Sequence, residues 1–119
     1  MHGSHQFPKR ERLQRRVEFR RVYDNGQRIE GRLAVLYALD TPGAQRAVGV
    51  VTSRRIGGAV IRNRARRLLR EAYRLNKTKV KPGVQLIVIA RSAIRHAHYR
   101  EIEAALLNLF EKAGCLLKV

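Results

Sequence analysis

Arginine is the residue type whose spacing indicates most of the chemistry in this chain. Residues 54–70 read RRIGGAVIRNRARRLLR, with seven arginines among seventeen residues and no acidic residue. A guanidinium is always charged and binds phosphate oxygens through paired hydrogen bonds. This spacing therefore indicates contact with a polyanion through its phosphate groups.

The same segment has the periodicity of an amphipathic helix. At 100° per residue it forms an apolar stripe, typical of a helix packed on a core, which consists of Ile61, Ala65, Leu68, Leu69 and Ala72. Four polar side chains point the opposite way: Asn63, Arg67, Arg70 and Arg74. Arg62 and Arg64 flank the stripe. Arginines three or four positions apart repel each other, so we expect an anionic partner to neutralise them.

Composition limits the class of partner. The 119 residues include 26 Lys and Arg against nine Asp and Glu, a formal net charge of +17. That charge favours nucleic acid over anionic membrane, because no apolar run approaches the 18 residues of a spanning helix. A basic helix that is only a solvated surface remains the alternative interpretation.

Catalytic and metal-binding patterns are weak. Glu101 and Glu103, the closest pair of carboxylates, do not face each other on a helix, and no phosphate-binding glycine loop is present. The histidines have no Cys or carboxylate pair at ligand spacing; they are His2, His5, His96 and His98. We predict neither a catalytic residue nor a metal site on the protein.

Cysteine usage and the N-terminus indicate the compartment. Cys115 is the single cysteine, so an intrachain disulfide cannot form, and we expect it to be a small apolar residue. The polar, basic N-terminus lacks the apolar region of a signal peptide, which predicts a cytoplasmic protein.

Hydrophobic patterning predicts one domain over residues 16–119, preceded by a basic, mobile tail over residues 1–15. The predicted elements are helices over 17–24, Ala59–Leu75 and 98–113, and strands over 33–40, 47–53 and 84–91. The first two of these strands are separated by a short connection, which predicts a hairpin. Arg28–Ile29 is a candidate edge strand.

Three aromatic residues allow two interpretations. Phe19 and Tyr23 lie one helical turn apart, and Tyr37 lies in a predicted strand. They could be core residues, which spacing alone slightly favours, or they could form a stacking surface for unpaired bases.

The arginine segment also carries a family motif. Residues 53–74, SRRIGGAVIRNRARRLLREAYR, follow the signature S-[KR]-[KR]-x-G-x-A-V-x-R-N-[RK]-x-[KR]-R throughout. Matches outside the motif include the segments 19–23, FRRVY, and 89–91, IAR. Over residues 9–113 the chain resembles the protein subunit of bacterial ribonuclease P.

This resemblance implies a fold and an activity. The fold is α+β, a single-domain α/β sandwich similar to the second domain of ribosomal protein S5, with a left-handed βαβ crossover at the basic helix. The activity is removal of the 5′ leader from precursor tRNA by a large catalytic RNA, to which the protein is a cofactor. Mg²⁺ is held mainly by the RNA and the substrate, and the partners are ribonuclease P RNA and precursor tRNA, with no membrane and no further protein required.

The resemblance also implies two groups of binding residues. The residues that contact the RNA subunit are Arg62, Asn63, Arg64, Arg66, Arg67 and Arg70. The residues that line or rim a cleft for the single-stranded leader are Phe19, Tyr23, Tyr37, Arg54, Arg55 and Arg91. This favours the stacking interpretation of Phe19 and Tyr23.

Two positions depart from the family pattern. Gly58 stands where many members carry Lys or Asn, which implies one contact fewer. Leu33–Ala34 stands where some members carry an aromatic residue, which implies weaker stacking from the sheet side of the cleft.

Two other functions compete with this one. Size and charge suit a ribosomal or RNA-chaperone protein equally well. Only the signature over residues 53–74 distinguishes the ribonuclease P protein subunit from such a protein. A nuclease that acts without RNA would need a cluster of carboxylates, which the scattered acidic residues do not predict.

Overall fold

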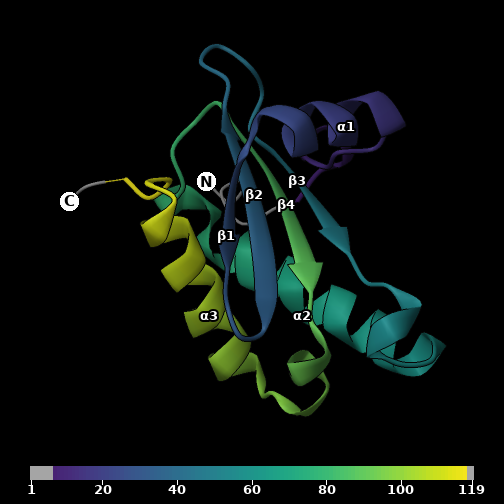
Figure 1. Ribbon diagram of the computed structural model, residues 1–119. Coiled ribbons are helices and arrows are strands. Elements are labelled where there is room, and N and C mark those ends of the chain that lie inside the picture. The colour runs from purple at the N-terminus through teal and green to yellow at the C-terminus, as the bar shows by residue number, and fades with distance from the viewer. Residues whose placement is uncertain (1–6, 118–119) are drawn as a thin grey trace.

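Four strands form a single mixed sheet in the order β1-β2-β4-β3, in a computed structural model that describes residues 7–117 (Figure 1). The strands are β1 (Gln27–Glu30), β2 (Ala34–Asp40), β3 (Ala47–Val51) and β4 (Val84–Ala90). β1 pairs with β2 and β2 with β4, both antiparallel, whereas β3 pairs with β4 in parallel. The candidate edge strand at Arg28–Ile29 is confirmed as part of β1.

The predicted hairpin between residues 33–40 and 47–53 is wrong. β4 lies between β2 and β3, and its register with β2 runs from Ala34↔Ala90 to Asp40↔Val84. Strand β4 reads VQLIVIA, and Leu86, Ile87 and Val88 are at most 1% exposed. A strand this apolar is stable when it has a neighbouring strand on each edge and is covered on both faces. Burial of β4 in the middle of the sheet therefore decides the pairing, and the short connection between β2 and β3 does not.

Three α-helices cover the two faces of the sheet. They are α1 (Arg16–Asn25), α2 (Ala59–Asn76) and α3 (Tyr99–Lys112), and short 3-10 turns lie at Lys9–Glu11, Arg54–Ile56, Lys77–Lys79 and Ser92–His96. All three helices occur where hydrophobic periodicity predicts them. α2 and α3 pack on one face, and α1 packs on the other against β2 and β4.

The connection from β3 to β4 passes through α2. In Figure 1 the chain descends β3, crosses behind the sheet in α2, and descends again in β4 to the left of β3. This crossover is left-handed, as the resemblance implies, although parallel crossovers are nearly always right-handed.

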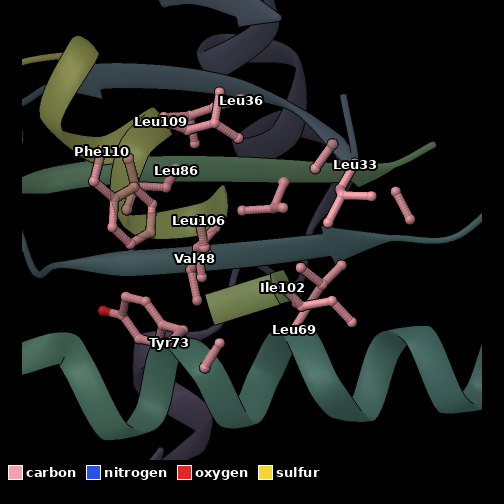
Figure 2. Packing of buried hydrophobic residues seen from close by; sticks show 14 of the residues in the cluster. Leu33, Leu36, Val48, Leu69, Tyr73, Leu86, Ile102, Leu106, Leu109 and Phe110 are labelled. Atoms are coloured by element: carbon pink, nitrogen blue, oxygen red, sulfur yellow. The ribbon is translucent and has the colours of Figure 1, made fainter. Parts of the chain in front are cut away.

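The main core lies between the sheet and the pair α2 and α3 (Figure 2). Its sheet residues include Leu36, Val48 and Leu86, and the helices contribute Leu69, Tyr73, Ile102, Leu106, Leu109 and Phe110. The predicted stripe of α2 is confirmed, because Ala65, Leu69 and Ala72 are buried and Ile61 and Leu68 pack beside them.

A smaller cluster lies on the opposite face, under α1. Its buried members are Leu13, Val22, Ala47 and Ile87, and the partly buried ones are Phe19, Tyr37, Leu39, Val51 and Ile89. α1 therefore covers this face only in part.

Residues 7–13, predicted as part of the tail, pack onto the domain. Arg12 forms a parallel bridge with Val48, and the Phe7 ring lies 5.3 Å from that of Tyr73. Lys77 Nζ donates to Glu11 Oε1 at 2.8 Å, and both side chains are buried. The domain thus begins before the predicted boundary at residue 16, and residues 1–6, with His2 and His5, lie outside the described residues.

Candidate nucleic-acid interface

The arginine surface of α2 begins at a glycine pair. Gly57 has a φ of 147°, a conformation that favours glycine, and Gly58 is the N-cap of the helix. From there Asn63 and Arg67 are exposed, as the periodicity predicts. Arg62, Arg64, Arg66 and Arg70 are half-buried, so they lie along the sides of the helix.

Two of these arginines are bound within the protein. Arg64 Nη2 donates to the carbonyl oxygen of Ala97 at 2.8 Å. Arg66 donates to Asn63 Oδ1 at 3.0 Å and to Thr52 Oγ1 at 2.7 Å. These hydrogen bonds fix the guanidinium groups, because a long side chain otherwise has many rotamers.

Arg70 lies in a different environment. Its pKa is lowered, first by burial and then by the nearby charges of Arg12 and Arg66. Both causes disfavour the charged form. A bound anion would reverse this effect.

Aromatic side chains gather where α1 meets the sheet. The rings of Tyr23 and Tyr37 lie 4.9 Å apart in an edge-to-face arrangement, and Tyr23 is 37% exposed. Burial, and then the neighbouring Tyr37, raises the pKa of Tyr23. Phe19 is half-buried and lies against Gly49 of β3. The structure thus brings the three predicted aromatics to one face of the sheet.

A cationic hollow lies at the end of that face away from α1. It has a volume of about 260 Å³ and is lined by Ser53, Arg55, Ile56, Ile89, Ala90, Arg91 and Ser92. Arg91 is held by a hydrogen bond from Nη1 to the carbonyl oxygen of Gly31 at 3.0 Å, and lies 3.6 Å from Glu30. Arg54 is exposed on the same 3-10 turn as Arg55 but does not line the hollow.

The expectation for Leu33–Ala34 is wrong. Both residues are at most 3% exposed and belong to the core beneath α2 and α3. Side chains alternate along a strand, so Val35 and Tyr37 face the side on which α1 lies, and Ala34 faces away from it. Leu33 and Ala34 therefore do not lie on the face that α1 partly covers.

Among residues 7–117, no three His, Cys, Asp or Glu side chains come together in a way that could hold a metal ion. No helix in the described part of the chain is both long and apolar enough to cross a membrane.

Comparison with known proteins identifies the family. Residues 7–114 match the family model described as Ribonuclease P. The chain belongs to the ribonuclease P protein family. The ribonuclease P protein component of Alkaliphilus oremlandii is 41% identical over 105 residues, 88% of this chain and 92% of that protein.

Solved ribonuclease P proteins have the same fold. A Staphylococcus aureus RNase P protein has a TM-score of 0.82 and 25% identity, covering 92% of this chain and all of that one. A Thermotoga maritima RNase P protein has a TM-score of 0.77 and 27% identity, covering 87% and 97%. This chain is the protein subunit of the enzyme that processes the 5′ end of tRNA, so the ribosomal, chaperone and lone-nuclease alternatives are set aside.

Several residues at these ribonuclease P surfaces were not predicted from the sequence. Arg28 Nε donates to the Tyr37 hydroxyl at 3.1 Å and also pairs with Glu30. Thr52 accepts from Arg66, and Arg12 approaches Arg70. The contact between Arg28 and Tyr37 could have been inferred from the pairing of β1 with β2, in which these residues are opposite each other. The contact of Arg66 with Thr52 and the approach of Arg12 to Arg70 have no local sequence pattern that would predict them.

Proposed function

We propose that this ribonuclease P protein uses its two surfaces for two RNAs. The arginine face of α2 docks on the RNA subunit, and the open face of the sheet holds the single-stranded 5′ leader of precursor tRNA. One observation carries the proposal: the sheet face beside α1 is only partly covered, with aromatic rings at one end and a cationic hollow at the other.

The docking surface comprises Arg62, Asn63, Arg64, Arg66, Arg67 and Arg70. Arg67 and Asn63 are exposed, and the Arg67 guanidinium and the Asn63 amide nitrogen can donate to phosphate or sugar oxygens, since Asn63 uses only its Oδ1, as the acceptor from Arg66. Arg64 and Arg66 are already held by protein acceptors, so their remaining donors are preorganised. Contacts of this kind bind RNA irrespective of sequence and weaken with salt.

The leader surface comprises Phe19, Tyr23, Tyr37, Arg54, Arg55 and Arg91. Bases of the leader stack on the aromatic rings, and its phosphates lie toward the arginines. Stacking tolerates any base because every base has a π-face. A subunit that serves many precursor tRNAs needs this tolerance.

The physical role of the protein is to join two polyanions. The RNA subunit and the precursor tRNA repel each other, and a subunit of net charge +17 between them reduces that repulsion. Hydrolysis at the 5′ end is Mg²⁺-dependent chemistry, which we assign to the RNA subunit and the substrate. The protein's own residues bind and orient RNA, and we place their action in the cytoplasm.

The docking surface is tested with Arg67→Ala. Binding to a bacterial ribonuclease P RNA transcribed in vitro is measured over a series of KCl concentrations. Loss of one phosphate contact reduces the slope of log K against log salt by about 0.7 to 0.9. Circular dichroism checks that the fold is retained, as expected for an exposed residue.

Lys112→Ala is the matched control, since Lys112 is exposed at the end of α3 and its loss removes the same charge. A slope that Arg67→Ala leaves unchanged, or that Lys112→Ala reduces equally, would contradict docking through α2. Processing of precursor tRNA at low Mg²⁺ by the reconstituted enzyme provides the functional measurement.

A further inference from the structure

Three arginines from two separate segments converge beside β3. Arg12 is placed there by its bridge to Val48 and by the bond from Leu13 N to the Val48 carbonyl oxygen. Arg66 reaches Thr52, one residue beyond the end of β3. Arg70 follows one helical turn later on α2, close enough to be affected by both other charges.

Among the described residues, no acidic side chain pairs with this cluster. The carboxylate of Glu11, adjacent to Arg12 in the chain, is bound by buried Lys77 at 2.8 Å. Glu71, adjacent to Arg70, is bound by Arg74 at 2.7 Å. In the part of the chain that the structure describes, none of the three clustered arginines forms an ion pair.

Hydrogen-bond donors also remain available in the cluster. Arg70 makes no hydrogen bond to any described residue. Arg12 donates from Nη2 to the Phe7 carbonyl oxygen at 2.9 Å, and no described residue accepts from its Nη1. Since a guanidinium carries five N–H donors, each of the three arginines can still bind an anion.

We propose that Arg12, Arg66 and Arg70 together bind one phosphate group of the RNA subunit. This site rests on the proposed docking of α2 on RNA, and it extends that surface onto the N-terminal segment. The segment is held rigidly by the buried Glu11–Lys77 pair and by Phe7 against Tyr73. Arg12 is therefore preorganised for binding, which lowers the entropic cost of the contact.

The site has a signature that a purely structural cluster lacks. In the free protein the three like charges oppose each other, so removal of Arg70 relieves repulsion. In the complex the phosphate attracts all three, so the same removal weakens binding. Stability of the free protein and affinity for RNA should thus change in opposite directions.

The test compares Arg12→Gln and Arg70→Gln with the control Arg10→Gln. Arg10 is exposed in the same segment as Arg12, and its substitution changes the charge equally. Affinity for a bacterial ribonuclease P RNA transcribed in vitro is measured at one low salt concentration. Arg12→Gln and Arg70→Gln should each weaken binding about ten-fold or more, and Arg10→Gln less than two-fold.

Two further measurements establish convergence on one phosphate. The double variant should lose less affinity than the product of the single losses, because both side chains bind the same group. The melting temperature of free Arg70→Gln at low salt should equal or exceed that of the unmodified protein.

Arg12→Gln could also act by disturbing how residues 7–13 pack on the domain. Phe7→Leu tests this alternative, because it loosens the same segment without altering its charge. Equal losses of affinity for Phe7→Leu and Arg12→Gln would overturn the site, as would an Arg12→Gln variant that binds like Arg10→Gln. Arg67→Ala separates the two proposals. If Arg67→Ala weakens binding and Arg12→Gln does not, α2 docking stands and the phosphate site falls; if neither does, both fall.

Discussion

The contact between α1 and β3 can be tested with Gly49→Ala. A Cβ atom at position 49 would lie 2.6 Å from Cε1 and Cζ of Phe19 and 3.4 Å from Cβ of Leu13. Ordinary van der Waals contact begins near 3.4 Å, so the Phe19 ring must retreat by about 0.8 Å. Val22 and Ile87 are fully buried beside it, which leaves the ring only an outward path.

The substitution should reduce both stability and leader binding. Overpacking of this kind costs about 1 to 3 kcal/mol of unfolding free energy, measurable by urea denaturation. A base stack contributes about 1 to 3 kcal/mol, and a displaced ring forfeits part of it. We expect affinity of the reconstituted enzyme for leader-bearing precursor tRNA to fall about five-fold, with mature tRNA unaffected. Docking on the RNA subunit should not change, because α2 lies on the other face of the sheet.

The second substitution Phe19→Leu provides the control. In the Gly49→Ala background the smaller side chain should recover most of the lost stability, but leader affinity should stay low because the ring is gone. If Gly49→Ala alters neither property, the close packing of α1 on β3 is wrong. If stability falls while leader affinity holds, Phe19 is a core residue only.

Three further predictions concern buried ionisable groups. Lys77→Met should cost about 3 to 5 kcal/mol in urea denaturation, because it leaves Glu11 buried without a partner; Glu11→Gln in the same chain should recover part of this. Burial raises the pKa of Tyr73 to about 12, so its stabilising neutral form is complete below pH 10 and is lost as pH rises toward 12. Ultraviolet absorbance should show late ionisation that Tyr73→Phe partly removes. The remainder belongs to Tyr99, whose pKa is raised to about 12 by burial and Glu103, and to Tyr23, whose pKa is raised by burial and Tyr37. Burial raises the pKa of the Cys115 thiol, so a disulfide reagent should react slowly until urea unfolds the chain.

Local periodicity was sufficient for the elements but not for their pairing. The stripe of α2 repeats over three turns, so its bounds were predicted within a residue. The hairpin prediction failed because it weighed only the length of the loop after Asp40. Strand β2 pairs with β4 instead of β3, and β4 begins more than forty residues after Asp40. The interior position of β4 depends on burial by distant segments, which local sequence patterns do not reveal.

The candidate surfaces divide in the same way. The exposure of Arg67 follows from helical geometry and was predicted. The hydrogen bond from Arg66 to Thr52 was not predicted, because it depends on where β3 ends relative to α2. Arg12 was assigned to a tail because its segment is polar and basic. Its position is decided by neighbours, above all the buried pair of Glu11 with Lys77, that composition does not reveal.

The separation of the two proposed RNA surfaces follows from the sizes of the elements. α1 has ten residues and is about 15 Å long, whereas the seven residues of β2 or β4 span roughly 23 Å. One short helix therefore cannot cover a face that α2 and α3 cover together on the other side. Half-buried Tyr37 lies where α1 meets the sheet, and half-buried Ile89 lines the hollow at the other end of the face. Apolar surface of this kind is costly to leave in water, and an unpaired base can cover it. Because α2 lies on the opposite face, the protein can hold the leader on one side of its sheet while its arginine helix contacts the RNA subunit on the other.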